Sequence, residues 1–188
     1  EPLGQTEYRE LADIIGASAA VETIIPLAQS YVMVSYEEQK LGGMLRGIEP
    51  GDAMYAELRS GMLAGDLQAL KSGEYGIVLG SQVARKLGLF VGDRLQLTLP
   101  QLSVTPLGIF PRIKSAAVVG VFQVGAEVDG SAVFMYRGDV QNLLRLGDRY
   151  QGLQIQLRDP YAVATQMPKF VDLLPPTTAW FSWQESMS

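Results

Sequence analysis

Leucine occupies every second position of residues 94–99, and the positions between are polar. Successive side chains of a strand point to opposite faces, so this spacing predicts a half-buried β-strand. Residues 112–122 are rich in alanine and valine and predict a second strand. We expect the two strands to pair as a long hairpin with residues 100–111 at its tip.

Patterns elsewhere predict a mixture of helices and strands. Apolar residues at helical spacing mark the helices, with Ser81, Gly88 and Asp159-Pro160 as capping signals, and Pro168 predicts a kink or a break. Helices are expected over residues 8–15, 81–87, 138–146 and 160–173, weaker helical pieces over 53–60 and 67–71, and further strands over 21–35, 40–48, 75–79, 131–136, 151–157 and 177–183. This order predicts an α+β fold, in which the outer pieces form one α/β layer structure and a β-rich middle is inserted between them.

The tip of the hairpin is the most informative part of the chain. Prolines bracket it, and the residues between are largely apolar: Leu102, Val104, Leu107, Ile109 and Phe110. A chain reversal normally runs over the surface, and contiguous exposed apolar surface usually marks a binding site. One interpretation is a loop that folds back onto its own core. The other, which we favour because of the resemblance described below, is a protruding arm that binds a partner.

Composition excludes several classes of function. The 188 residues are 47% hydrophobic and carry a net charge of −5 with mixed signs, which predicts one folded domain or two small ones and no nucleic-acid partner. The absence of cysteine and histidine excludes disulfides, thiolate metal sites and Ser-His or Cys-His nucleophiles. No apolar run approaches the roughly 18 residues that span a bilayer, and no signal peptide is visible, so the chain is either a whole protein or the soluble piece of a longer one.

Motifs that would carry chemistry are weak. Residues 76–81 resemble a phosphate-binding turn but lack its lysine and glycine spacing, so Gly80 is expected only to permit a strand-to-helix turn. Glu127, Asp129 and Gly130 come closest to a cation site, but their spacing favours a turn with Gly130 at a special backbone angle. The pair Glu37-Glu38 is typical of a solvated turn. We therefore expect no catalytic residue, no metal and no cofactor.

Polar and basic residues flank the tip. Arg112 and Lys114 are two positions apart, so they share a strand face, and Gln96 lies on the polar face of the preceding strand. They predict a polar and basic patch at the root of the arm. Ordinary solubilising strand surface is an equally good interpretation of the same residues. An apolar anchor with a polar rim is the usual anatomy of a protein interface.

Several motifs point to a known family. Residues 105–111 read TPLGIFP and are followed by VVGVF and, at residues 126–130, by AEVDG. Together with GIVLGSQVARKLGLFVGDRLQL at residues 76–97 and RGIEP at residues 46–50, they resemble the periplasmic domain of LolC/LolE-type permease subunits of the lipoprotein-releasing ABC transporter of Gram-negative bacteria. The glycine-rich elements are shared with the wider MacB-like permease superfamily, whereas the Thr-Pro-x-Gly-x-x-Pro arm points to the LolC-like subunit.

The resemblance implies a fold of two parts. A porter-like α/β subdomain would comprise residues 1–62 and 149–188, and an inserted β-rich, sabre-like subdomain would comprise residues 63–148 and carry a protruding hairpin. It also implies a periplasmic domain of an inner-membrane protein, whose full-length parent spans the membrane and works with a second permease subunit and a cytoplasmic ATPase.

The resemblance also implies which residues bind. In LolC-like subunits a hook captures the periplasmic lipoprotein chaperone LolA, and a nearby pad assists. The hook maps onto residues 100–111, with Pro100, Leu102, Val104, Thr105, Pro106, Leu107, Gly108, Ile109, Phe110 and Pro111 as contacts. The pad maps onto Gln96, Arg112, Ile113 and Lys114, although the family has a basic residue at the place of Gln96 and a polar one at the place of Ile113.

The leading hypothesis is therefore a non-catalytic domain that recruits a lipoprotein carrier, with ATP hydrolysis on a separate subunit. An alternative is a force-transmitting periplasmic domain of a related MacB-like efflux-type permease, in which the arm packs on a neighbouring subunit. A third is a histidine-free glycosidase or lyase that uses carboxylates.

Overall fold

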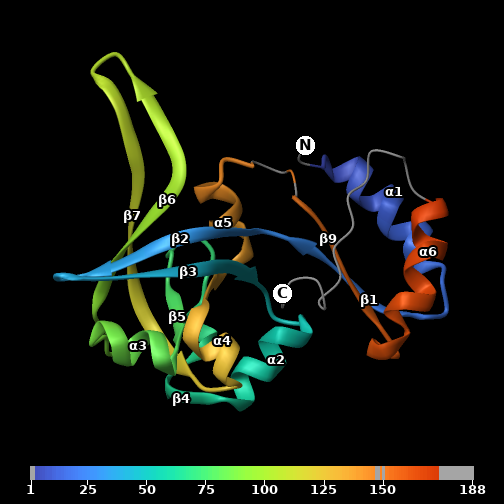
Figure 1. The fold of residues 1–188 in the computed structure, drawn as a ribbon, viewed down its shortest axis with the longest axis horizontal. Coiled ribbons are helices and arrows are strands. Elements are labelled where there is room, and N and C mark those ends of the chain that lie inside the picture. Colours follow the sequence, from blue (N-terminus) through green and yellow to red (C-terminus); the bar gives the residue numbers. More distant parts are fainter. Residues whose placement is uncertain (1–2, 147–148, 150, 174–188) are drawn as a thin grey trace. The chain divides into compact units, whose positions relative to one another are not determined.

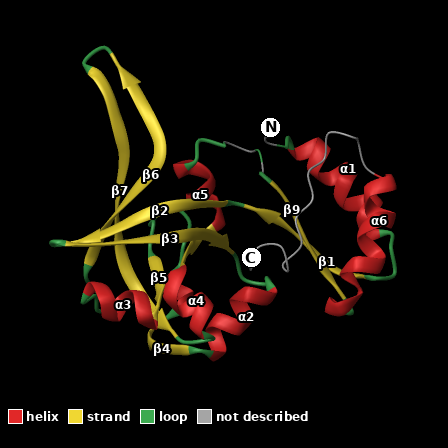
Figure 2. Cartoon of the chain, in the orientation of Figure 1, coloured by secondary structure: helices red, strands yellow, loops and turns green. Residues whose placement is uncertain are grey.

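The computed structural model describes residues 3–146, 149 and 151–173. The helices are α1 (Gln5–Gly16), α2 (Ala53–Ser60), α3 (Ser81–Leu87), α4 (Ala126–Ser131), α5 (Arg137–Leu143) and α6 (Val163–Leu173), with 3-10 turns η1 (Leu67–Ala69) and η2 (Pro160–Ala162). The strands are β1 (Val21–Leu27), β2 (Gln29–Tyr36), β3 (Gln39–Ile48), β4 (Met62–Gly65), β5 (Ile77–Gly80), β6 (Arg94–Thr105), β7 (Gly108–Phe122), β8 (Ala132–Tyr136) and β9 (Gly152–Leu157). The predicted α+β class is confirmed (Figures 1 and 2). The strand expected over residues 177–183 lies outside the described residues.

The chain divides into two compact units. One comprises Ala28–Gly147, and the other comprises Glu1–Leu27 with Asp148–Ser188. The division differs from the predicted subdomains over residues 28–62. These residues were expected in the outer subdomain, but they belong to the unit Ala28–Gly147. The physical reason is strand pairing: β2 pairs with β6, and β3 pairs with β8, so both strands are part of the middle sheet. The single strand expected over residues 21–35 is split accordingly, with β1 in one unit and β2 in the other.

The larger unit is built on one seven-stranded sheet in the order β4-β7-β5-β8-β3-β2-β6. The long strand β7 pairs with β6 along its first part and with β5 and β4 along its last part. The sheet therefore closes on itself through the β6–β7 pairing and forms a barrel-like wall (Figure 2). Closure removes most free strand edges, which would otherwise be open to pairing with other chains.

As the leucine alternation predicts, β6 is half-buried. Leu95, Leu97 and Leu99 are buried in the main hydrophobic core, whereas Arg94 and Gln96 are exposed. Val32 and Val34 of β2 and Ala116 of β7 point to the same core. A second core lies under α2 and is centred on Phe122 and Phe134, whose ring centroids are 5.5 Å apart.

Glycine positions partly agree with the sequence expectations. Gly88 ends α3 at φ +71°, as predicted for a left-handed helix end. Gly80, not Ser81, is the N-cap of α3, and its backbone is ordinary at φ −60°. The glycine is needed there because a Cβ would lie 2.2 Å from the backbone oxygen of Asp129. The turn expected at Glu127, Asp129 and Gly130 is instead part of the helix α4, and Gly130 has no positive φ, so that prediction was wrong.

Buried charged residues hold the framework of the larger unit. Arg137 is buried and pairs with Asp52, which is also buried, and with the Oε2 atom of Glu49 at 3.4 Å. Asp129 accepts hydrogen bonds from the amides of Val124 and Gly125 and thereby fixes the start of α4. Such groups are tolerated in the interior only when they are paired or hydrogen-bonded.

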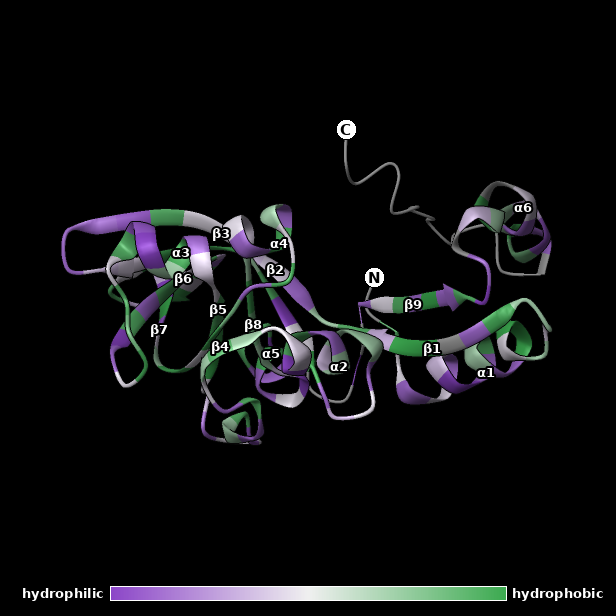
Figure 3. Ribbon diagram, turned by 90° about the horizontal axis from the view of Figure 1, so that it is seen from below, coloured by the Kyte–Doolittle hydropathy of each residue, from purple (hydrophilic) through white to green (hydrophobic). Residues whose placement is uncertain are grey.

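The smaller unit is a two-stranded sheet with helices. Strands β1 and β9 are antiparallel, and Ile15 of α1, Val21 of β1 and Phe170 of α6 form its core. Strand β1 is largely hydrophobic, while α1 carries both hydrophobic and hydrophilic residues (Figure 3). Asp159 accepts a hydrogen bond from the amide of Tyr161, as its predicted capping role requires. Among the described residues, no helix combines the length and the hydropathy that a bilayer crossing requires.

Candidate functional site

The β6–β7 hairpin extends beyond the barrel. Strand β6 pairs with β2 only at residues 96–98, whereas its pairing with β7 continues to the turn at residues 106–107. The register shifts between Leu99 and Leu102, so Pro100 and Gln101 form a bulge, which bends the ribbon at the point where it leaves the barrel. Figure 1 shows the resulting two-stranded arm.

The end of the arm is a tight turn stabilised by its own side chains. Thr105 and Gly108 are directly opposed on the two strands, and Pro106 and Leu107 form the two-residue turn between them. Proline fixes a negative φ and excludes the mirror-image turns that most two-residue hairpins use. The positive φ needed to reverse the chain is instead supplied by Gly108, at φ +134°. The Thr105 hydroxyl donates to the Gly108 carbonyl at 3.1 Å and accepts from the Leu107 amide at 3.3 Å.

The apolar side chains of the arm are exposed. Leu107 is 91% exposed, Val104 79% and Phe110 49%, and Leu102 and Ile109 are also exposed. The interpretation of a loop folded onto its own core is therefore wrong. The reason is that both strands remain paired with each other up to the turn, so no backbone returns to the barrel.

Pairing divides the arm into two faces, because directly opposed residues lie on the same side of a sheet. The outer face carries the pairs Leu102–Pro111 and Val104–Ile109, followed towards the barrel by Ile113. The inner face carries Phe110 opposite Ser103, then Arg112 and Lys114, and leads to buried Ala116. The outer face is thus apolar and the inner face is mixed.

The four predicted pad residues do not lie on one face. Arg112 and Lys114 share a face, as predicted, and they lie opposite Leu99 and Leu97 on the inner side. Gln96 lies opposite Ser115, and Ile113 opposite Thr98, so both belong to the outer side. The structure therefore brings together the two basic residues and separates them from Gln96 and Ile113.

Lys114 is held by a partner that sequence reasoning did not identify. Its ammonium nitrogen lies 3.8 Å from the centroid of the Tyr75 ring, a cation–π contact. Tyr75 has a left-handed backbone with φ +52°. Asp139, fully buried, accepts hydrogen bonds from the amides of Gly73 at 2.7 Å and Tyr75 at 2.9 Å, which hold this conformation. The separation of Tyr75 from Asp139 along the chain leaves no sequence signal for this arrangement.

Arg112 is also constrained on the inner face. Its guanidinium donates to Oε1 of Gln101 at 2.9 Å, within the bulge. Burial, and secondly the positive charge of Arg145, lower the pKa of Arg112. Arg112 and Lys114 form no ion pair with an acidic residue of the described part of the chain. The inner face is therefore suited to an acidic partner group.

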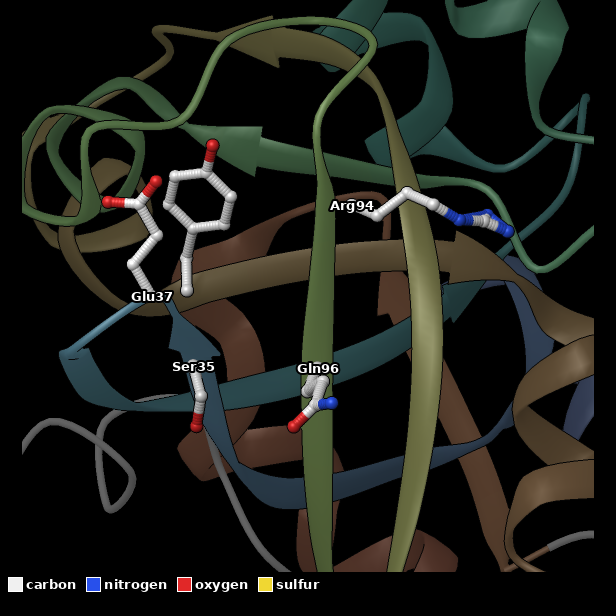
Figure 4. Close-up of a pocket in the computed structure, with 5 residues that line it drawn as sticks. Ser35, Glu37, Arg94 and Gln96 are labelled. Atoms are coloured by element: carbon white, nitrogen blue, oxygen red, sulfur yellow. The ribbon is translucent and has the colours of Figure 1, made fainter.

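Gln96 belongs to a separate shallow depression of about 260 Å³ on the outer side. Ser35, which is opposite Gln96 on β2, lines it together with Tyr36, Glu37 and Arg94 (Figure 4). Burial first, and then the negative charges of Asp93 and Glu37, raise the pKa of Tyr36. Within the described residues no three His, Cys, Asp or Glu side chains gather as metal ligands.

These features define an α+β domain with an extended two-stranded arm, and solved structures share its fold. The extracellular domain of the noncanonical ABC-type transporter YknZ from Gram-positive bacteria matches with a TM-score of 0.53 at 15% identity, covering 92% of this chain and 82% of that chain. The periplasmic region of MacB from Actinobacillus actinomycetemcomitans matches with a TM-score of 0.53 at 12% identity, covering 88% and 72%.

Sequence comparison gives the family. Residues 2–169 match the MacB-like periplasmic core domain, and the chain belongs to this family. It is a non-catalytic domain family of permeases, which confirms the expectation that the chain is not an enzyme and that it is a periplasmic domain of an inner-membrane permease.

Curated relatives of the chain include LolC proteins. The lipoprotein-releasing system transmembrane protein LolC of Neisseria meningitidis is 31% identical over 157 residues, which are 82% of this chain and 38% of that protein. The protein of the same description from Xylella fastidiosa is 34% identical over 136 residues, 71% of this chain and 32% of that protein. The chain thus spans about a third of the length of these relatives.

Proposed function

We propose that this domain recruits a periplasmic lipoprotein carrier of the LolA type to a lipoprotein-releasing ABC transporter, with the hook, residues 100–111, as the main contact. The observation that carries the proposal is the exposure of the apolar side chains along a paired, projecting hairpin. The similarity to LolC proteins over most of the chain supports it. In the complete transporter, a second permease subunit and a cytoplasmic ATPase complete the assembly.

In this proposal the two compact units have different tasks. The unit Ala28–Gly147 acts as the sabre-like subdomain that carries the hook, and the other unit acts as the porter-like subdomain. The closed sheet is a suitable base for the hook because β6 and β7 are both fixed in the barrel wall before they leave it. A contact residue on such an element is held more precisely than one on a free loop.

The apolar side chains of the hook supply the binding energy. Complete burial of Leu107, Ile109 and Phe110 contributes about 1.5–3 kcal/mol for each side chain. Lost translational and rotational freedom offsets several kcal/mol of this gain. A reversible complex with a dissociation constant on the order of micromolar is the expected balance. Weak binding suits a carrier that must depart with its cargo.

The pad contributes in two separate parts. Arg112 and Lys114 face acidic groups of the carrier on the inner side of the hook, and Gln96 and Ile113 contact it on the outer side. Because the basic residues are partly exposed, they increase the association rate and the selectivity more than the affinity.

Titration of the 188-residue chain with a purified LolA-type carrier tests the proposal. The comparison variant replaces residues 100–111 by Asn-Gly, because Leu99 and Arg112 are directly opposed and Asn-Gly is the preferred two-residue hairpin turn. We expect binding by the intact chain and none by the shortened variant, with circular dichroism and melting temperature preserved. Absence of binding by the intact chain would favour the force-transmitting alternative. Equal binding by both chains would exclude the hook.

A further inference from the structure

The apolar face of the hook continues onto the outer wall of the barrel. Thr98 on β6 lies opposite Ile113 on β7 on one side and opposite Met33 on β2 on the other, and Met33 lies opposite Gly42 on β3. Opposed residues share a face. Ile113, Thr98, Met33 and Gly42 therefore form one row across neighbouring strands, at the level where the hook begins.

Two large apolar side chains of β2 are exposed on this wall. Tyr31 is 74% exposed and Met33 42%, whereas Val32 and Val34, which alternate with them, are buried. Lower residue numbers on β2 lie opposite higher numbers on β6, so Tyr31 lies on the hook side of Met33. A Cβ added at Gly42 would meet nothing within 4 Å, so the flank of Met33 is open.

We infer that the strip of Tyr31, Met33 and Thr98, which continues from Ile113 onto the barrel wall, is a second part of the carrier-docking surface. The inference rests on the proposed function. A carrier that encloses the hook must meet the barrel at the root of the hook, and on the outer side the root is apolar. The carrier surface that rests there is the apolar rim of its lipid-binding mouth.

The two sides of the hook root differ in polarity and therefore suit different surfaces of a partner. The apolar pairs Leu102–Pro111 and Val104–Ile109 lead directly to Ile113 and the strip, whereas the inner side leads to Arg112 and Lys114. At Met33 the strip offers no free strand edge, because Met33 is paired with both Gly42 and Thr98. Docking there is therefore by side-chain contact and not by addition of a strand.

Charge favours a foreign partner over a second copy of this chain. Residues 94–126 contain Arg94, Arg112 and Lys114 and no acidic residue, whereas the whole chain has a net charge of −5. If two hooks packed against each other, Arg112 and Lys114 of both copies, which lie on the inner side, would find no acidic partner within residues 94–126. A carrier with an apolar mouth and acidic groups beside it fits both sides of the root.

The test compares strip variants of the 188-residue chain in titration with a purified LolA-type carrier. We expect Met33→Glu and Tyr31→Glu each to weaken binding about tenfold, as burial of a charge at the centre of an interface does. Met33→Leu and Tyr31→Phe are the matched controls that retain affinity. Phe90→Glu is the remote control, because Phe90 is 75% exposed and precedes β6 at the end away from the hook.

The outcomes separate this inference from the proposed function. If the Asn-Gly replacement of the hook abolishes binding while Met33→Glu and Tyr31→Glu have no effect, the strip is not part of the interface and the hook proposal stands. If the hook replacement also has no effect, the proposed function fails. Self-association, or binding to anionic phospholipid vesicles, that is lost in Met33→Glu while carrier binding is retained would assign the strip to another occupant and overturn the inference.

Discussion

The ammonium nitrogen of Lys114 lies 3.8 Å from the centroid of the Tyr75 ring at the root of the hook. Lys114 is on β7, and Tyr75 precedes β5, so the contact joins a strand of the projecting hairpin to a loop of the barrel. The Tyr75 backbone has φ +52°, which is unusual for a bulky residue. The carboxylate of Asp139 accepts a hydrogen bond from the Tyr75 amide and holds this conformation. Lys114 is therefore positioned by two residues that are distant from it in sequence.

The cation–π contact is expected to be measurable as a coupling energy. In a double-mutant cycle of Tyr75→Leu and Lys114→Met, we expect the effects on the free energy of unfolding to be non-additive by about 0.5–1 kcal/mol. The two substitutions keep apolar packing, and the left-handed backbone of residue 75 is common to both branches of the cycle. Urea denaturation of the four proteins measures the coupling. Additive effects would show that the contact does not stabilise the fold.

The carboxylate of Asp139 is expected to be necessary for the Tyr75 conformation. Asp139→Asn replaces one acceptor oxygen by an amide that faces the backbone N–H of Gly73 or Tyr75, and we expect a loss of about 2–3 kcal/mol in the free energy of unfolding. Asp66→Asn is the matched control, because Asp66 is exposed and its side chain accepts a hydrogen bond from the amide of Gln68. If both variants lost equally little free energy of unfolding, the Asp139 carboxylate would not be needed to hold the Tyr75 backbone.

The hook side chains are expected to affect binding and not folding. Ile109→Asp and Phe110→Asp should each weaken carrier binding by more than about tenfold, because they place a charge where apolar contact is needed. The melting temperature should change little, since surface substitutions usually alter stability by less than about 0.5 kcal/mol. Ile109→Val is the control that retains binding. A collapse of the melting temperature would instead mean that these residues stabilise the domain.

The basic residue Lys114 is expected to act through long-range electrostatics. Lys114→Glu should weaken carrier binding less than Ile109→Asp does, and mainly at low salt, because the screening length falls from about 30 Å at 0.01 M to about 8 Å at 0.15 M. Lys86→Glu on α3 changes the net charge equally at an exposed position outside the hairpin. Titrations at several salt concentrations make the comparison. An affinity that is unchanged at every concentration would remove Lys114 from the interface.

Sequence reasoning located the hairpin but grouped its root residues incorrectly. The sharing of a face by Arg112 and Lys114 follows from the strand period alone and is confirmed. The grouping of Gln96 with them depended on the register between strands. Leu97, not Gln96, lies opposite Lys114, and a shift of one residue moves a side chain to the other face. No local pattern determines that register.

The α+β class, the hairpin and its apolar end were predictable from the sequence, because strand alternation, proline positions and the turn residues Thr105 to Gly108 act locally. Three relationships follow from the fold and from no local pattern: β2 and β3 belong to the barrel, Tyr31 and Met33 flank the hook, and Asp139 and Tyr75 position Lys114. These relationships join residues that are far apart along the chain, and the closure of one sheet through the pairing of β6 with β7 places them side by side.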